Sequence, residues 1–246
     1  MEGAAPFYVE GNSVGLLVSH GFTGTTQSMR PLCEAYASEG YTVCGPRLKG
    51  HGTHYEDLEQ TNYQDWISSI EEGYEWLKQR CDTIFVIGLS MGGSLALYMA
   101  EHHPEIRGIS VINPGINIPA MEHVREIDGQ NEARFSDAIG SDIKKPGVTE
   151  LAYEKTPVRS VKEALTLMDK VRANLPKVTC PALIFVSPED HVVPADNAQI
   201  VFNEISSQSK EVRQLKDSYH VATLDNDQQL IIDDTLDFIM RHLPSH

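Results

Sequence analysis

Short apolar runs alternate along this chain with segments in which apolar residues recur every three or four positions. Most of the runs are continuous, which is typical of β-strands buried on both faces of a sheet. The intervening segments have the spacing of helices with one buried face. We therefore predict an α/β protein with a mostly parallel sheet covered by helices on both sides. The strands are predicted at residues 14–19, 41–45, 83–88, 108–113, 182–187 and 212–216, and the helices at 28–38, 65–80, 90–102, 195–206 and 227–242.

One connection is much longer than the others, because about 70 residues follow the strand that ends near Asn113, too many for a structureless loop. Helical patterns occur in it at residues 119–127, 133–141 and 161–175. We predict that this insertion forms a small helical cap over the carboxyl edge of the sheet; an insertion that serves only packing is the alternative. The predicted parts are a core of residues 1–113 and 176–246, and the cap with its return connection at 114–175.

The charge of the chain excludes some partners. Acidic residues outnumber basic ones by 35 to 20, giving a net charge of -15. Binding to a nucleic acid or docking on an anionic membrane needs clustered cations, so neither is expected. The N-terminus has no basic or apolar region typical of a secretory signal, which predicts a cytoplasmic protein. The oligomeric state stays open between a monomer and a weak dimer.

A serine stands where a buried strand turns into a helix, in Gly88-Leu89-Ser90-Met91-Gly92. Gly-x-Ser-x-Gly between a strand and a helix is the pattern of a nucleophile elbow, which exposes the serine hydroxyl at the edge of the sheet. The pattern alone is weak, and a glycine-lined turn capped by Ser90 is the alternative. The apolar strand before it and the helical spacing after it favour the nucleophile.

A serine nucleophile needs a base, and the base needs an orienting acid. In this kind of site the acid and the histidine follow the serine in that order. Two late turns, each after a strand, contain such residues: Pro188-Glu189-Asp190-His191 and Asp217-Ser218-Tyr219-His220. We predict Asp190 as the orienting acid and His220 as the base. Glu189 and Asp217 are the rival acids, and His191 is a rival base that neighbours the acid.

The oxyanion formed by serine attack needs fixed N–H donors. The amide of Met91, directly after the serine, is one expected donor. The loop His20-Gly21-Phe22-Thr23-Gly24 follows an early strand, and its Phe22 amide is the other. His51 and His54 could suggest a metal, but no nearby carboxylate or cysteine completes a ligand set, so no metal is predicted.

Together these residues resemble the α/β-hydrolase family, especially its small bacterial carboxylesterases and monoacylglycerol lipases. The resemblance extends over nearly the whole chain, through "HGFTGTTQSMRPL", "GYTVCGPRLKGHGTHYED", "GLSMGG", "ELAYEKTP", "FVSPEDHVVP" and "SYHVATLDND". It implies a sheet-centred hydrolase with a small cap, a Ser90, Asp190 and His220 triad, oxyanion donors at Phe22 and Met91, and no metal or organic cofactor. The reaction implied is hydrolysis of a carboxylic ester through an acyl-enzyme.

The substrate must be inferred from the cap. Apolar residues there could line an acyl channel or could pack the cap onto the core: Ile116, Ile118, Met121 and Ile139, with Val124, Ile127 and Phe135. Glu150 is a candidate acceptor of hydrogen bonds from glycerol, or an ordinary exposed helix acid. We expect a small lipid ester, most specifically a monoacylglycerol, with no membrane insertion beyond transient contact of the cap with a lipid interface. A general carboxylesterase, a lactonase or C–C hydrolase, and a non-catalytic ligand-binding protein remain alternatives.

Overall fold

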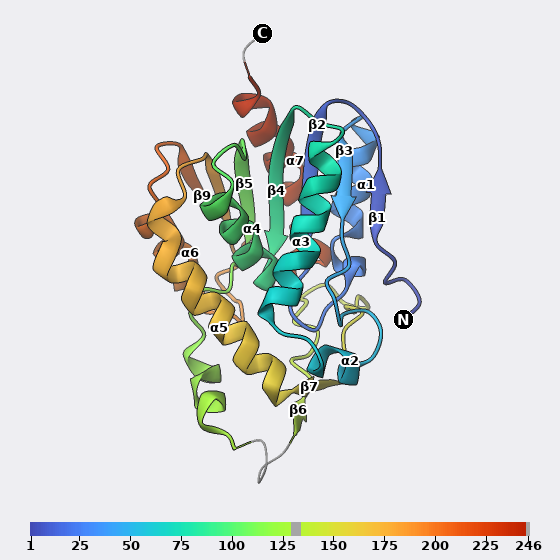
Figure 1. Ribbon diagram of the computed structural model, residues 1–246, viewed down its shortest axis with the longest axis vertical. Helices are drawn as coiled ribbons and strands as arrows, with labels where there is room; N and C mark the ends of the chain where they lie inside the picture. Colours follow the sequence, from blue (N-terminus) through green and yellow to red (C-terminus); the bar gives the residue numbers. More distant parts are fainter. Residues whose placement is uncertain (129–133, 245–246) are drawn as a thin grey trace.

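A seven-stranded sheet forms the centre of the computed structural model, in the order β1-β3-β2-β4-β5-β8-β9 (Figure 1). The structure describes residues 1–128 and 134–244. Every neighbouring pair is parallel except β1 and β3, which are antiparallel. The predicted α/β class and mostly parallel sheet are therefore confirmed. The strands are β1 (Phe7–Val9), β2 (Val14–Ser19), β3 (Thr42–Gly45), β4 (Thr83–Leu89), β5 (Gly108–Ile112), β8 (Ala182–Val186) and β9 (Lys210–Gln214).

The middle strand, β4, explains why the apolar runs are continuous. Its Ile84 and Val86 side chains join the apolar cluster on one face of the sheet. Phe85 and Ile87 join the cluster on the opposite face. Because successive side chains of a strand point to opposite faces, both sets of β4 positions must be apolar when helices cover both faces.

Helices cover the two faces unequally. α3, α4, α5 and α6 contribute to the first cluster and lie in front of the sheet in Figure 1, whereas α1 and α7 contribute to the second and lie behind it. The helix α4 begins one residue after Ser90 and packs on β4 and β5. The bounds are α1 (Arg30–Ser38), α2 (Tyr55–Glu59), α3 (Tyr63–Lys78), α4 (Met91–His102), α5 (Val158–Asn174), α6 (Asp196–Glu204) and α7 (Gln228–His242).

The long connection leaves β5 and returns to β8, its neighbour in the sheet. It contains the 3-10 helix η2 (Pro119–Glu126), strands β6 (Phe135–Asp137) and β7 (Lys155–Pro157), helix α5, and the 3-10 turn η3 (Leu175–Lys177). The helix expected at 133–141 is wrong for its described residues: β6 pairs with β7 there, and Ala133 lies outside the described residues. The helix expected at 119–127 is a 3-10 helix, which begins at Pro119.

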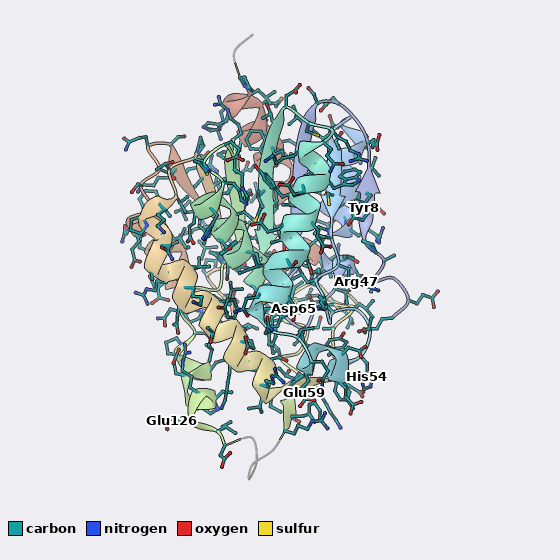
Figure 2. All side chains as sticks on the ribbon, in the orientation of Figure 1. Tyr8, Arg47, His54, Glu59, Asp65 and Glu126 are labelled. Atoms are coloured by element: carbon teal, nitrogen blue, oxygen red, sulfur yellow. The ribbon has the colours of Figure 1, made fainter. Side chains whose placement is uncertain are left out.

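The long connection between β5 and β8 contacts α2 at the lower end of the molecule in Figure 1. Glu59, labelled in Figure 2 close to the start of α5, accepts a hydrogen bond of 2.6 Å from Nε of Arg134, directly before β6. Glu126, at the end of η2, lies at the same end of the molecule in that view. The contact fastens the start of β6 to a helix that follows β3 in the chain. The remaining short 3-10 turns are η1 (Thr26–Ser28) and η4 (Ala222–Leu224).

Candidate active site

Ser90 stands at a strained corner between β4 and α4. Its backbone has φ 57° and ψ -119°, in a region that costs a residue with a side chain about 1–3 kcal/mol. The flanking glycines make the corner possible: a Cβ at Gly88 would overlap the carbonyl of Gly92, and a Cβ at Gly92 would overlap the carbonyl of Ser19. The Gly-x-Ser-x-Gly spacing therefore follows from close backbone packing around a forced serine conformation, as the sequence predicted.

Asp190 and His220 meet at the carboxyl edge of the sheet. His220 Nδ1 lies 2.7 Å from Asp190 Oδ2, and the two side chains are 8% and 1% exposed. The other oxygen of Asp190 accepts hydrogen bonds of 2.8 Å from the amides of Val192 and Val193. Three donors thus hold the carboxylate, and with Nδ1 occupied the imidazole has Nε2 left for another partner.

The two predicted oxyanion donors flank Ser90. Met91 is the first residue of α4, so its amide lacks the partner that a residue in the preceding turn would supply. Phe22 lies in a loop in which Thr23 has a φ of 60°, and a Cβ added at Gly21 would lie 3.2 Å from the Cβ of Ser90. The absence of a side chain at Gly21 lets this loop approach the serine closely.

His20 opens this loop, and nothing in the sequence pattern assigns it a role. His20 Nδ1 lies 2.9 Å from the carbonyl oxygen of Gly21, and the amide of Leu48 donates to Nε2 at 3.2 Å. Because Nε2 accepts, the proton of the neutral ring is on Nδ1, which donates to Gly21. Burial lowers the pKa of His20 to about 4, which keeps the ring in this neutral form.

A cavity of about 590 Å³, its open mouth included, is lined by many of the predicted site residues. Ser90, His220, Phe22 and Met91 all line it. From the long connection, Ile118, Met121, Ile139 and Glu150 line it as well, together with Ala164, Leu165 and Met168 of α5. Most of these walls are apolar, which suits an aliphatic ligand.

Ile116 was expected at the cavity and lies elsewhere. It is 2% exposed and packs in the apolar cluster on the α4 side of the sheet. Its amide donates to Asn197 Oδ1 at 2.8 Å, which fixes the chain as it leaves β5. Its apolar character is explained by core packing, which the sequence pattern could not separate from a lining role.

Glu150 is the acidic side chain that faces this cavity. It lies in an irregular segment instead of on an exposed helix, and its amide donates to Ser141 Oγ at 2.8 Å. The next amide, of Leu151, donates to Gln27 Oε1 at 2.9 Å. Burial raises the pKa of Glu150 to about 7, against the opposing effects of His220 and Ser28. Its carboxyl group is therefore poised to exchange a proton near neutral pH.

The rival acids and base lie away from this constellation. Glu189 and Asp217 are 56% and 75% exposed, and both carboxylates face the ammonium of Lys144. The ring of His191 is 60% exposed and lies 2.8 Å from Asp142, whose hydrogen bond raises the pKa of His191. None of the three lines the cavity that contains Ser90, as far as the chain is described.

The histidines that could suggest a metal have other partners. His51 is fully buried against the rings of His20, Phe22 and Trp66, and burial lowers its pKa well below the usual value. His54 caps α2 by accepting from the amide of Glu56 at 3.3 Å. Within residues 1–128 and 134–244, no three His, Cys, Asp or Glu side chains are grouped to hold a metal ion.

Asn113 and Asp142 bind the backbone of His220, and the sequence pattern predicts neither contact. Asn113 Nδ2 donates to the carbonyl of His220 at 2.8 Å, and its Oδ1 accepts from the amide of Ser187 at 2.8 Å. Its φ of 44° is one that asparagine tolerates better than most residues. The only signal in the sequence is a polar residue at the end of a buried strand.

Comparison with known proteins decides the family. Residues 13–227 match the family described as serine aminopeptidase, S33. The chain belongs to this family. A thermostable monoacylglycerol lipase from Bacillus sp. (strain H-257) is 60% identical to this member over 242 residues, covering 98% of this chain and 96% of that protein. A carboxylesterase from Bacillus subtilis (strain 168) is 29% identical over 235 residues, covering 95% of each chain.

Solved structures agree with the fold. A structure from work on LipS and LipT, two metagenome-derived lipolytic enzymes, superposes with a TM-score of 0.95 at 45% identity, covering 98% of this chain and 99% of that one. Monoacylglycerol lipase from Paleococcus ferrophilus has a TM-score of 0.79 at 15% identity, covering 97% and 99%. The predicted α/β-hydrolase fold is confirmed. None of the helices described for this S33 family member is long and apolar enough to cross a membrane.

Proposed function

We propose that the protein hydrolyses monoacylglycerols to a free fatty acid and glycerol, with Ser90 as nucleophile, His220 as base and Asp190 as orienting acid. The protein is a carboxylic ester hydrolase by its relatives. The observation that carries the assignment of roles is that Ser90 and His220 line one cavity while Asp190 binds His220 Nδ1. This is the arrangement that serine attack on an ester requires.

The reaction proceeds by acyl transfer. His220 Nε2 takes the proton of the Ser90 hydroxyl as the oxygen attacks the ester carbonyl, and the amides of Phe22 and Met91 stabilise the oxyanion. The C–O bond to the alcohol then breaks, and the alcohol leaves with the proton from His220. Water attacks the acyl-enzyme in the same way, which releases the fatty acid and restores Ser90. Asp190 orients the ring through Nδ1 and stabilises the imidazolium.

The lining of the cavity supports a monoacylglycerol as substrate. Ile118, Met121 and Ile139 offer apolar contacts to one acyl chain, while Glu150 offers a hydrogen-bond acceptor to the hydroxyl groups of glycerol. A diacyl or triacyl lipid lacks one or both of these hydroxyl groups. The apolar residues come from the connection 114–175, which we propose is a cap that makes transient contact with a lipid interface. The cytoplasmic location remains a prediction.

Activity on mono-, di- and triacylglycerols and on simple p-nitrophenyl esters tests this function. We expect the highest kcat/KM on monoacylglycerols, and Ser90→Ala should lower kcat by roughly 10⁴–10⁶-fold while leaving the protein folded. A fluorophosphonate should label the parent and not Ser90→Ala. An active Ser90→Ala protein would refute the nucleophile.

A general carboxylesterase is the second candidate, favoured by the 29% identity to a carboxylesterase. In that case kcat/KM would follow acyl length alone, and esters of glycerol and of simple alcohols with the same acyl group would be cleaved equally well. The same panel of substrates therefore separates the two functions.

A further inference from the structure

Asp142, from the connection 114–175, joins the turn of the predicted acid to the turn of the predicted base. Its Oδ2 accepts hydrogen bonds of 3.0 Å from the backbone amides of His220 and His191. Its Oδ1 accepts from His191 Nδ1 at 2.8 Å. The carboxylate is 15% exposed. Since His191 directly follows Asp190, one side chain fixes the backbone next to both members of the Asp190–His220 pair.

A second carboxylate, from the core, binds backbone amides of the connection 114–175 in return. Asp225 is 1% exposed and follows the turn that contains the predicted base, His220. It accepts from the amides of Lys144 and Lys145 at 2.7 and 2.9 Å, and from the amide of Tyr219 at 2.9 Å. Asp142 from one side and Asp225 from the other thus hold residues 142–145 against residues 219–220. Charge-assisted bonds of this kind are stronger than neutral ones.

The backbone of His220 is consequently fixed at both ends. Asp142 accepts from its amide, and Asn113 donates to its carbonyl. The imidazole can approach Ser90 correctly only if this backbone is correctly placed, because the ring has only two rotatable bonds beyond it. A displacement of about 1 Å in a reacting group can cost about 10²-fold in rate.

We propose that Asp142 is a positioning residue that couples the cap to the catalytic base. The proposal rests on the proposed function, since it assigns to His220 the role of base. The side chain touches no reacting atom; it acts through the amide of His220. A rearrangement of the connection that moved residues 142–145 would therefore also move the base.

Substitution of Asp142 tests the proposal with kcat and KM on a p-nitrophenyl ester. Asp142→Ala removes the acceptors while the backbone bond from the amide of Val221 to the carbonyl of Asp142, 3.0 Å, can persist. We expect kcat to fall about 10- to 100-fold with KM changed less than about twofold. Asp142→Asn keeps one oxygen that can accept from both backbone amides, so its kcat should stay much closer to that of the parent than the kcat of Asp142→Ala.

His191→Ala is the matched control, because it removes the exposed ring that binds Asp142 Oδ1 and contacts Tyr219, and leaves both backbone amides bound to Asp142 Oδ2. Its kcat should stay within about twofold of the parent. The low-field NMR signal of the His220 Nδ1 proton should shift or broaden in Asp142→Ala and remain in His191→Ala. A purely structural role of Asp142 would lower the melting temperature without this pattern.

The outcomes separate the two proposals. Parent-like kcat in Asp142→Ala, or an equal loss in His191→Ala, would overturn the positioning role while Ser90→Ala remained inactive. Full activity of Ser90→Ala would overturn the proposed function itself. If Asp142→Ala fails to fold, Asp142→Leu takes its place, because leucine has nearly the same size and offers no acceptor to the amides of His220 and His191. Parent-like kcat together with an unchanged Nδ1 proton signal in Asp142→Leu refutes the role, and a reduced kcat with a displaced signal supports it.

Discussion

Gly24 lies directly against the carboxyl group of Glu150. A Cβ built on Gly24 would overlap Oε1 of Glu150 and lie 3.2 Å from its Cδ, both at the end of a flexible side chain, while the carbonyl oxygen of Gly21 would be at an ordinary 3.7 Å. A methyl group at position 24 can therefore be accommodated by moving the carboxyl group. The two residues belong to distant parts of the chain, the predicted oxyanion loop and the connection 114–175.

Gly24→Ala should consequently reproduce the effect of Glu150→Ala. If Glu150 accepts hydrogen bonds from glycerol, both substitutions should lower kcat/KM for a monoacylglycerol about 10- to 100-fold at about pH 8, where the carboxyl group is mostly ionised, as expected for loss of a hydrogen bond to a charged group. Both should change kcat/KM for a p-nitrophenyl ester much less. Glu154→Ala, which removes an exposed acid nearby, is the control. Equal losses of kcat/KM on both substrates would show that Glu150 does not bind the alcohol part of the substrate.

The strained backbone of Ser90 predicts a gain in stability from glycine. Because glycine adopts a φ of 57° without a side-chain clash, Ser90→Gly should have a free energy of unfolding about 1 kcal/mol higher than Ser90→Ala. Both variants lack the hydroxyl, so they differ in stability and not in activity. Urea unfolding of the two proteins measures the difference. If Ser90→Ala proves as stable as Ser90→Gly, the corner does not store this strain.

The raised pKa of Glu150 predicts a pH dependence of stability. An unfolded glutamate has a pKa of about 4.3, whereas burial holds this one at about 7 in the folded protein. Between these values the folded state keeps a proton that the unfolded chain releases. The contribution to stability is therefore fully present below about pH 4.3 and is lost as the pH rises through about 7.

Glu150→Gln removes that titration. Relative to the parent, the free energy of unfolding of Glu150→Gln should rise between about pH 5 and about pH 8. Urea unfolding at several pH values checks this, with the exposed Glu154→Gln as a comparison that should stay parallel to the parent. A constant difference between Glu150→Gln and the parent over this range would contradict a raised pKa.

Strands buried on both faces were predictable, and short paired strands were not. β4 and its parallel neighbours are continuous apolar runs, because helices cover both of their faces. β1 has only three residues at an edge of the sheet, where Tyr8 is 48% exposed. β6 contains Ser136 and Asp137 and exists because it pairs with β7, about twenty residues further along the chain. No local pattern shows such a pairing.

The residues of the site also divide into those that the sequence predicts and those that it does not. Ser90 and Asp190 follow the buried strands β4 and β8, and His220 follows the edge strand β9. Because these strands are parallel, the meeting of the three residues at one edge of the sheet could be inferred from the sequence; their catalytic roles remain predictions. Asn113 and Asp142 act on backbone atoms of residues far away in the sequence, 107 and 78 positions for the bonds to His220. Backbone partners leave no trace in the sequence, which is why these two residues were missed.

The helix α5 both connects β5 to β8 and forms a wall of the cavity. Ala164, Leu165 and Met168 line the cavity, while Leu167 and Val171 of the same helix pack in the core. η2, in contrast, contributes Met121 to the cavity and has no buried residue. A substitution in η2 can reshape the cavity without disturbing the core, whereas one in α5 affects both. Divergence in acyl-chain preference, in nature or in directed evolution, should therefore accumulate in η2.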